Sequence, residues 1–153
     1  RVSQSGNTGN IHIPVDRNKP ALKASRLNPA LQDFSARLTP LSEVTATQTG
    51  AELMVDIQIE NTGVATWEST GKNPVCLSYH WHDMEGNVVE NDGLRTCLPR
   101  DIQPGERMKL VGLLRAPQSR GALRLIWTLV QEGVGWFDTN NRDSQFAVDV
   151  TVI

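Results

Sequence analysis

Apolar and polar residues alternate along several short stretches of this chain, and this period of two constrains the fold more than any other feature. Between residues 51 and 60 every second side chain is apolar: Leu53, Val55, Ile57 and Ile59. Successive side chains of a β-strand point to opposite faces of a sheet. The alternation therefore predicts a strand with one buried and one wet face.

The same pattern recurs along the chain and predicts further strands. They span residues 75–83, 88–90, 106–114, 122–131 and 145–153, with a weaker strand at 42–47. Turn residues separate them, and Pro104-Gly105 suits the two central positions of a type II turn. Seven or eight short strands without a long helix predict an all-β protein with an immunoglobulin-like antiparallel β-sandwich, and a jelly roll is the rival.

The first part of the chain has a different composition from the rest. Residues 1–20 are polar and rich in Gly and Asn, and Leu27, Leu31 and Phe34 then lie at helical spacing, interrupted by Pro29. We expect residues 1–40 to form a linker or N-terminal extension with at most a short helix, and residues 41–153 to form the β-sandwich domain. The chain begins at Arg1 rather than Met, so we expect a piece of a longer protein.

Charge and motifs exclude several classes of function. The 153 residues carry a formal net charge of −2, which argues against a nucleic-acid partner. No run of about 18 apolar residues is present, so we expect no direct membrane insertion. Nucleophile elbows, phosphate-binding loops, dinucleotide fingerprints and zinc-protease helices are all missing. We expect no catalysis and no cofactor, although paired carboxylates would leave no local signature.

Two segments offer weak metal-ligand patterns. Cys76, His80 and His82 would share one face of a strand, but no second ligand pair follows, so polar groups on a wet face are the preferred interpretation. The oxygen-rich loop 138–143 lacks the ligand spacing of a calcium loop, and a plain turn is preferred. We expect no metal. Cys76 and Cys97 form either one disulfide or two free thiols.

The tryptophans divide into two groups. Trp81 and Trp127 lie among alternating apolar residues and are predicted to be in the core, and Trp67 is expected to close one end of the sandwich. Trp136 lies in a glycine-flanked loop. A large aromatic side chain there either stacks on a sugar ring or covers the core, and both interpretations stay open.

Two polar segments, residues 91–96 and residues 131–132, are predicted to flank this loop. Arg95 pairs with Glu132 or Asp92 as a structural bridge, or these groups bind vicinal hydroxyls or the carboxylate of an acidic sugar. The predicted ligand-binding residues are Trp136, Asp92, Arg95, Thr96, Gln131, Glu132 and His82.

Several motifs follow one another in a characteristic order. They are Pro-Val-Cys-Leu-Ser-Tyr-His-Trp (74–81), Asp-Gly-Leu-Arg-Thr (92–96), Pro-Gly-Glu (104–106) and Val-Gln-Glu-Gly-Val-x-Trp-Phe (130–137). Over roughly residues 55–138 the chain resembles a β-sandwich module of bacterial polysaccharide proteins. That group includes glycosyltransferases, sugar methyltransferases and ATP-binding subunits of ABC transporters that export O-antigen, the Wzt type.

The resemblance implies a function. The module would be the C-terminal domain of the parent protein and would bind the O-antigen chain or its terminus, a lipopolysaccharide component, at the cytoplasmic face of the bacterial inner membrane. Its partners would be this polysaccharide and, through the parent protein, the membrane subunit of the transporter. A homodimer through a sheet edge is a further expectation. The alternative is an accessory structural or protein-docking domain of a glycosyltransferase or methyltransferase, in line with a more distant likeness at the Asn-Thr-Gly turn (61–63) and Trp67.

Overall fold

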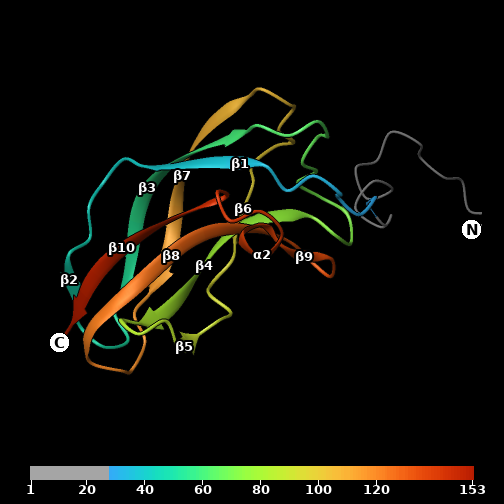
Figure 1. Ribbon diagram of the computed structural model, residues 1–153. Coiled ribbons are helices and arrows are strands. Elements are labelled where there is room, and N and C mark those ends of the chain that lie inside the picture. Colours follow the sequence, from blue (N-terminus) through green and yellow to red (C-terminus); the bar gives the residue numbers. More distant parts are fainter. Residues whose placement is uncertain (1–27) are drawn as a thin grey trace, which may run out of the picture.

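A computed structural model of the protein describes residues 28–153 and contains ten strands and one short helix in that range (Figure 1). The strands are β1 (Ala36–Pro40), β2 (Ala46–Thr47), β3 (Glu52–Asn61), β4 (Val75–Asp83), β5 (Val88–Glu90), β6 (Thr96–Cys97), β7 (Arg107–Arg115), β8 (Gly121–Gln131), β9 (Gly135–Trp136) and β10 (Gln145–Val152). The helix is α2 (Phe137–Asn140). Within residues 28–153 no helix combines the length and apolar character needed to cross a membrane.

The strands form two sheets that pack face to face. The small sheet has the order β1-β3-β7, and the large sheet has the order β2-β10-β8-β4-β5, with β6 paired to β4 and β9 to β8. All pairings are antiparallel except the short parallel pairing of β2 with β10. The consecutive strands β1 and β2 thus belong to different sheets. β4 and β8 lie at the centre of the large sheet. This arrangement is an immunoglobulin-like β-sandwich, as the alternation predicts.

Side chains that alternate along the central strands fill the space between the sheets. Leu77, Tyr79 and Trp81 of β4 are fully buried in the core between the sheets, together with Trp127 of the neighbouring strand β8. Tyr79 contacts both Trp81 and Trp127 with edge-to-face ring geometry. Burying side chains of this size contributes about 1.5–3 kcal/mol each to folding. Trp81 and Trp127 are therefore core residues, as predicted.

The Asn-Thr-Gly turn closes one end of the sandwich. The buried side chain of Asn61 donates hydrogen bonds to the carbonyl oxygens of Ala65 and Ile102 and accepts one from the backbone of Gly63. Trp67 is buried against this turn, and its backbone pairs with Ile102. The turn motif has a structural explanation in these contacts.

The sandwich begins earlier in the chain than the sequence pattern predicts. Residues 36–40, expected to lie in the extension, form β1 and pair with β3 along five register positions. Phe34 also belongs to the core, and the part of the predicted helical segment that is described, residues 28–34, is not helical. The strand was missed because its alternation is short and ends in a proline. The rest of the predicted linker lies outside the described residues.

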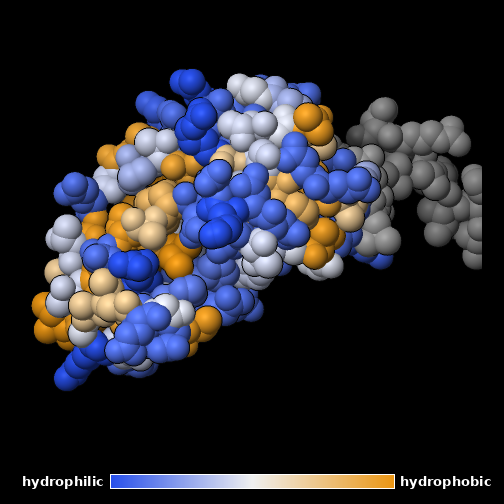
Figure 2. All heavy atoms as spheres, viewed as in Figure 1, coloured by the Kyte–Doolittle hydropathy of each residue, from blue (hydrophilic) through white to orange (hydrophobic). Residues whose placement is uncertain are grey.

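The two sheets diverge beside β2. Phe146 and Val148 of β10 point inward but are only half-buried, because an apolar gap of about 170 Å³ opens between them and Val44 and Val55. Figure 2 shows this gap as a hydrophobic area between the hydrophilic margins of the two sheets. The predicted inward orientation of Phe146 and Val148 is confirmed.

Candidate functional site

The outer face of β4 is covered, although its residue pattern predicts a wet face. Cys76, Ser78 and His80 point away from the core between the sheets, yet all three are buried. Two segments from distant parts of the chain cover them: the 91–97 loop and the segment of β9 and α2. The candidate site is formed where these two segments meet over β4.

The 91–97 loop lies directly on β4. The backbone N–H of Gly93 donates to the carbonyl oxygen of Tyr79 at 3.1 Å, and the Ser78 hydroxyl donates to the carbonyl oxygen of Leu94 at 3.0 Å. A Cβ atom at position 93 would lie only 2.6 Å from the Tyr79 oxygen. Position 93 therefore requires glycine, because only a residue without a side chain lets the loop approach β4 this closely.

The second segment follows the turn after β8. β9 pairs with the end of β8, with Trp136 opposite Val130. The next residue, Phe137, is fully buried and contacts the rings of Phe34 and Trp67 edge to face at centroid distances of 5.2 and 5.5 Å. Phe137 thus anchors the segment in the core and fixes the position of Trp136 above β4.

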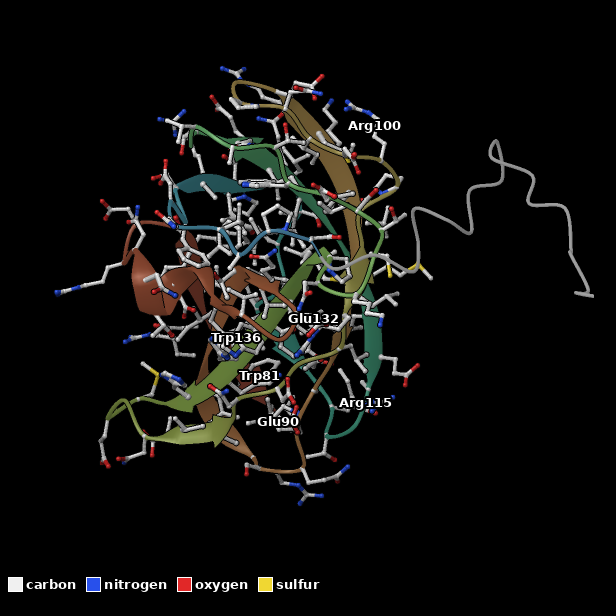
Figure 3. The ribbon with its side chains drawn as sticks, turned by 90° about the vertical axis from the view of Figure 1, so that its right-hand side faces the viewer. Trp81, Glu90, Arg100, Arg115, Glu132 and Trp136 are labelled. Carbon is white, nitrogen blue, oxygen red and sulfur yellow. The ribbon has the colours of Figure 1, made fainter. Side chains whose placement is uncertain are left out.

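Trp136 contacts two basic side chains. The guanidinium carbon of Arg95 lies 4.9 Å from the centre of the Trp136 ring, and the His80 ring lies 4.3 Å from it. Trp136 itself remains half-buried. Figure 3 shows Trp136 and Glu132 beside one another over the strand that carries Trp81. The indole therefore serves both as a cover for His80 and as part of the surface.

Arg95 connects the two segments through its hydrogen bonds. Its Nε donates to Glu132 at 2.8 Å, and its Nη2 donates to Asp92 at 2.7 Å. Its Nη1 donates to the carbonyl oxygen of Gly93 at 2.7 Å and to the Ser78 hydroxyl at 3.3 Å. The structural bridge proposed from the sequence therefore forms with both carboxylates. These hydrogen bonds raise the pKa of Arg95 above its ordinary value although burial lowers it.

His80 makes a second connection beneath Trp136. Its Nδ1 faces the carbonyl oxygen of Asn91, and its Nε2 lies 3.2 Å from the Asp138 carboxylate. Burial disfavours the charged imidazolium, but the hydrogen bonds to Asp138 and Asn91 outweigh this effect and raise the pKa of His80. Both ring nitrogens face acceptors, so the doubly protonated ring fits this environment best.

The structure brings together four of the seven predicted ligand-binding residues: Trp136, Asp92, Arg95 and Glu132. His82 lies at the margin, where its ring stacks on His80 at a centroid distance of 6.2 Å. Burial and the neighbouring His80 charge lower the pKa of His82.

Two predicted residues point elsewhere. The Thr96 hydroxyl accepts a hydrogen bond from the backbone of Leu113 in the small sheet. Gln131 is buried; its amide donates to the carbonyl oxygens of Pro29 and Asn73 and accepts from the backbone N–H of Leu31. Both side chains join parts of the fold, and neither faces the surface around Trp136.

The sequence patterns did not identify His80, Asp138 or Ser78 as parts of the site around Trp136. His80 was considered only as a metal ligand, and Asp138 only as part of a loop. The one local signal is the position of His80 and Ser78 on the β4 face that also carries His82. Their partners lie 58 and 17 residues further along the chain, at Asp138 and Arg95, where no local pattern reaches.

The sequence left open whether Cys76 and Cys97 form a disulfide, and it predicted no metal site. Cys76 and Cys97 are register partners on β4 and β6, and both are free thiols. Burial and the neighbouring Cys97 raise the pKa of Cys76 to about 12. Among residues 28–153 no group of three or more His, Cys, Asp or Glu side chains is placed to hold a metal ion.

Comparisons with known proteins give no family. The chain matches no protein-family model and no curated protein sequence. Solved structures with a similar chain path include β-glucosidase from Listeria innocua in complex with glucose, with a TM-score of 0.47 and 15% sequence identity, covering 77% of this chain and 16% of that one. Another is the sporulation control protein Spo0M from Bacillus subtilis, with a TM-score of 0.46 and 14% identity, covering 76% of this chain and 49% of that one. The chain thus spans half or less of each neighbour's length, and function is inferred from the geometry around Trp136.

Proposed function

We propose that this β-sandwich is a non-catalytic carbohydrate-binding module that recognises a bacterial cell-surface polysaccharide. One observation carries the proposal. Two segments far apart in the chain meet over β4 and place Trp136, Arg95, Asp92 and Glu132 on one surface. An aromatic ring beside planar polar side chains is the combination that binds a sugar, which has both apolar C–H faces and hydroxyl groups.

The surface suits recognition rather than reaction. Asp92 is 75% exposed, and Glu132 is 33% exposed, so both carboxylates can accept hydrogen bonds from hydroxyl groups outside the protein. His80, the group best suited to proton transfer, is buried beneath Trp136 and bound to Asp138. A shallow sugar contact buries few atoms, so we expect a Kd of about 10⁻⁶ to 10⁻³ M for one chain end.

The proposed biological setting rests on the resemblance of the sequence motifs. The segments 74–81, 92–96 and 130–137 resemble the C-terminal module of O-antigen export proteins. Two of these segments meet in the candidate site, and the third is the β4 strand beneath them. We therefore propose recognition of the O-antigen for ABC-transporter export, with the transporter membrane subunit as a partner of the parent protein at the cytoplasmic face of the inner membrane.

Calorimetric titration of the chain with O-antigen polysaccharide from the source strain tests this function. Asp92→Ala removes an exposed carboxylate and Trp136→Ala removes the indole; both are expected to weaken binding at least about tenfold. Met54→Ala, at a residue 76% exposed on the opposite sheet, is the matched control and is expected to bind like the unaltered chain. Thermal unfolding of each variant separates lost binding from lost folding.

Two results would contradict the proposal. Absence of binding by the folded, unaltered chain would favour the alternative, a structural or protein-docking domain of a glycosyltransferase or methyltransferase. Equal binding by the folded Asp92→Ala and Trp136→Ala variants would place the sugar elsewhere on the sandwich.

A further inference from the structure

The Arg95 guanidinium has no donor left for a ligand. An arginine has five N–H donors. The Nε donor is used by Glu132, the two Nη1 donors face Gly93 and Ser78, and the two Nη2 donors face Asp92 and Glu132. A ligand carboxylate could bind Arg95 only by displacing one of these partners within the protein. The sequence-based alternative in which Arg95 binds an acidic sugar therefore does not fit this geometry.

The exposed charge around Trp136 is acidic. Asp92 and Glu132 share the single positive charge of Arg95, while Asp138 is paired with His80 in the buried layer below. The Asp92 side chain is 75% exposed although it contacts Arg95. The groups that a ligand meets first are hydrogen-bond acceptors with negative charge, so they attract donors and repel anions.

We propose that this surface selects sugar units that present hydroxyl or ammonium donors, and that it rejects glycans with uronic acid or phosphate groups. The inference rests on the proposed function and adds the chemical class of the ligand. Arg95 acts as a positioning residue: it holds Asp92 and Glu132 in place and lies against the Trp136 ring. Asp92 and Glu132 make the contacts that determine specificity.

An array of bacterial surface polysaccharides tests the inference. The array groups them by repeat unit: neutral, with free amino groups, or with uronic acids. At mildly acidic pH and low salt, neutral and amino-bearing glycans are expected to bind, and acidic glycans at least about tenfold more weakly. Binding of the amino-bearing group is expected to weaken as salt screens the charges.

The Asp92→Asn variant adds a second readout. It removes one negative charge but keeps the size of the side chain and an oxygen acceptor. The variant is therefore expected to reduce the difference in binding affinity, here called the gap, between neutral and acidic glycans. Asp56→Asn, an exposed position on the outer face of the small sheet, is the matched control and is expected to leave the gap unchanged.

The outcomes separate the two proposals. Binding of acidic glycans as tight as that of neutral ones, or a gap that Asp92→Asn leaves unchanged, overturns the charge selection while the sugar-binding function stands. No binding to any polysaccharide on the array contradicts the proposed function and the charge selection together.

Discussion

The outer faces of the two sheets have similar alternating sequences but different surroundings. On the small sheet, outward residues of β3 and β7 such as Met54 and Val111 are exposed, and the ion pair between Glu52 and Arg115 lies in solvent. On β4 of the large sheet, outward residues such as Ser78 and His80 are buried beneath other parts of the chain. The outer face is thus open on the small sheet and covered on β4 of the large one.

The two outer faces also differ in the side chains that they bring together. The outer face of the small sheet is open to solvent, and no described segment covers its polar or its apolar side chains. The large sheet places two segments over β4, and these segments bring acids, a guanidinium and an indole together. We therefore expect substitutions at the covered face to affect folding and binding, and substitutions at the open face to affect neither.

The largest expected effect is at the anchor of the second segment. Phe137→Ala removes a fully buried ring that contacts Phe34 and Trp67, and such a truncation costs about 3–5 kcal/mol of unfolding free energy. The matched substitution on the open face, Met54→Ala, is expected to change it by less than about 0.5 kcal/mol. Urea denaturation measures both. Equal effects would contradict the comparison.

A smaller loss of stability is expected when an arginine–carboxylate pair is removed, and such pairs occur on both outer faces. Arg95→Met leaves the half-buried Glu132 without its Arg95 partner and removes the hydrogen bond that the Ser78 hydroxyl accepts, which is expected to cost about 1.5–3 kcal/mol of unfolding free energy. Arg115→Met removes an exposed pair with Glu52, and the effect is expected to be clearly smaller because water replaces the contact. Urea midpoints of the two variants measured side by side decide this, and the reverse order would show that Arg95 does not connect the covering segments.

The pH dependence of stability is expected to differ in sign between two neighbouring histidines. The pKa of His80 is raised in the folded protein, so its stabilising contribution is complete below the ordinary value of 6.5 and is lost as pH rises through the folded-state pKa. The pKa of His82 is lowered, so its contribution is complete above 6.5 and is lost as pH falls through the lowered pKa.

His80→Gln and His82→Gln separate these two contributions. The unfolding free energy of each variant is measured from below to above pH 6.5. The decline in stability at higher pH is expected to disappear in His80→Gln. The decline at lower pH is expected to disappear in His82→Gln. Unchanged pH profiles in both variants would contradict the assigned environments.

The smallest expected effect is a difference in reactivity between the two thiols, which is measured on the unaltered chain. Cys97 is exposed, whereas Cys76 is buried and has a pKa of about 12, so little reactive thiolate forms there near neutral pH. Alkylation of the reduced chain with iodoacetamide, followed by mass spectrometry, is expected to label Cys97 first and Cys76 only after unfolding. Equal labelling rates in the native protein would mean that the 91–97 loop does not cover β4.

Local sequence patterns predict the strands well because alternation and turn chemistry act over a few residues. The inward orientation of Trp81 and the turn at Pro104-Gly105, where Gly105 has a φ of +87°, follow from such patterns. The covered face of β4 could not be predicted in this way. Ser78 and His80 look like the wet side of a strand, and only contacts with Arg95 and Asp138 explain their burial.

The candidate site was predictable in part for the same reason. Trp136, Asp92, Arg95 and Glu132 are all in loops or at strand ends, where ligand-binding residues are common. Gln131 looked equivalent to its neighbour Glu132, but Gln131 is the last residue of β8 and Glu132 already belongs to the turn that follows. The side chain of Gln131 faces the chain around Pro29 rather than the surface.

Amide chemical-shift mapping tests the central claim most directly. The isotope-labelled chain is titrated to saturation with cognate O-antigen polysaccharide, and every amide is followed. We predict shifts concentrated in residues 91–96 and 131–138 on the covered face of the large sheet, with the amides of β3 and β7 unchanged. Saturating polysaccharide that moves no amide near Asp92 or Trp136, or that moves those of the small sheet instead, would contradict the account.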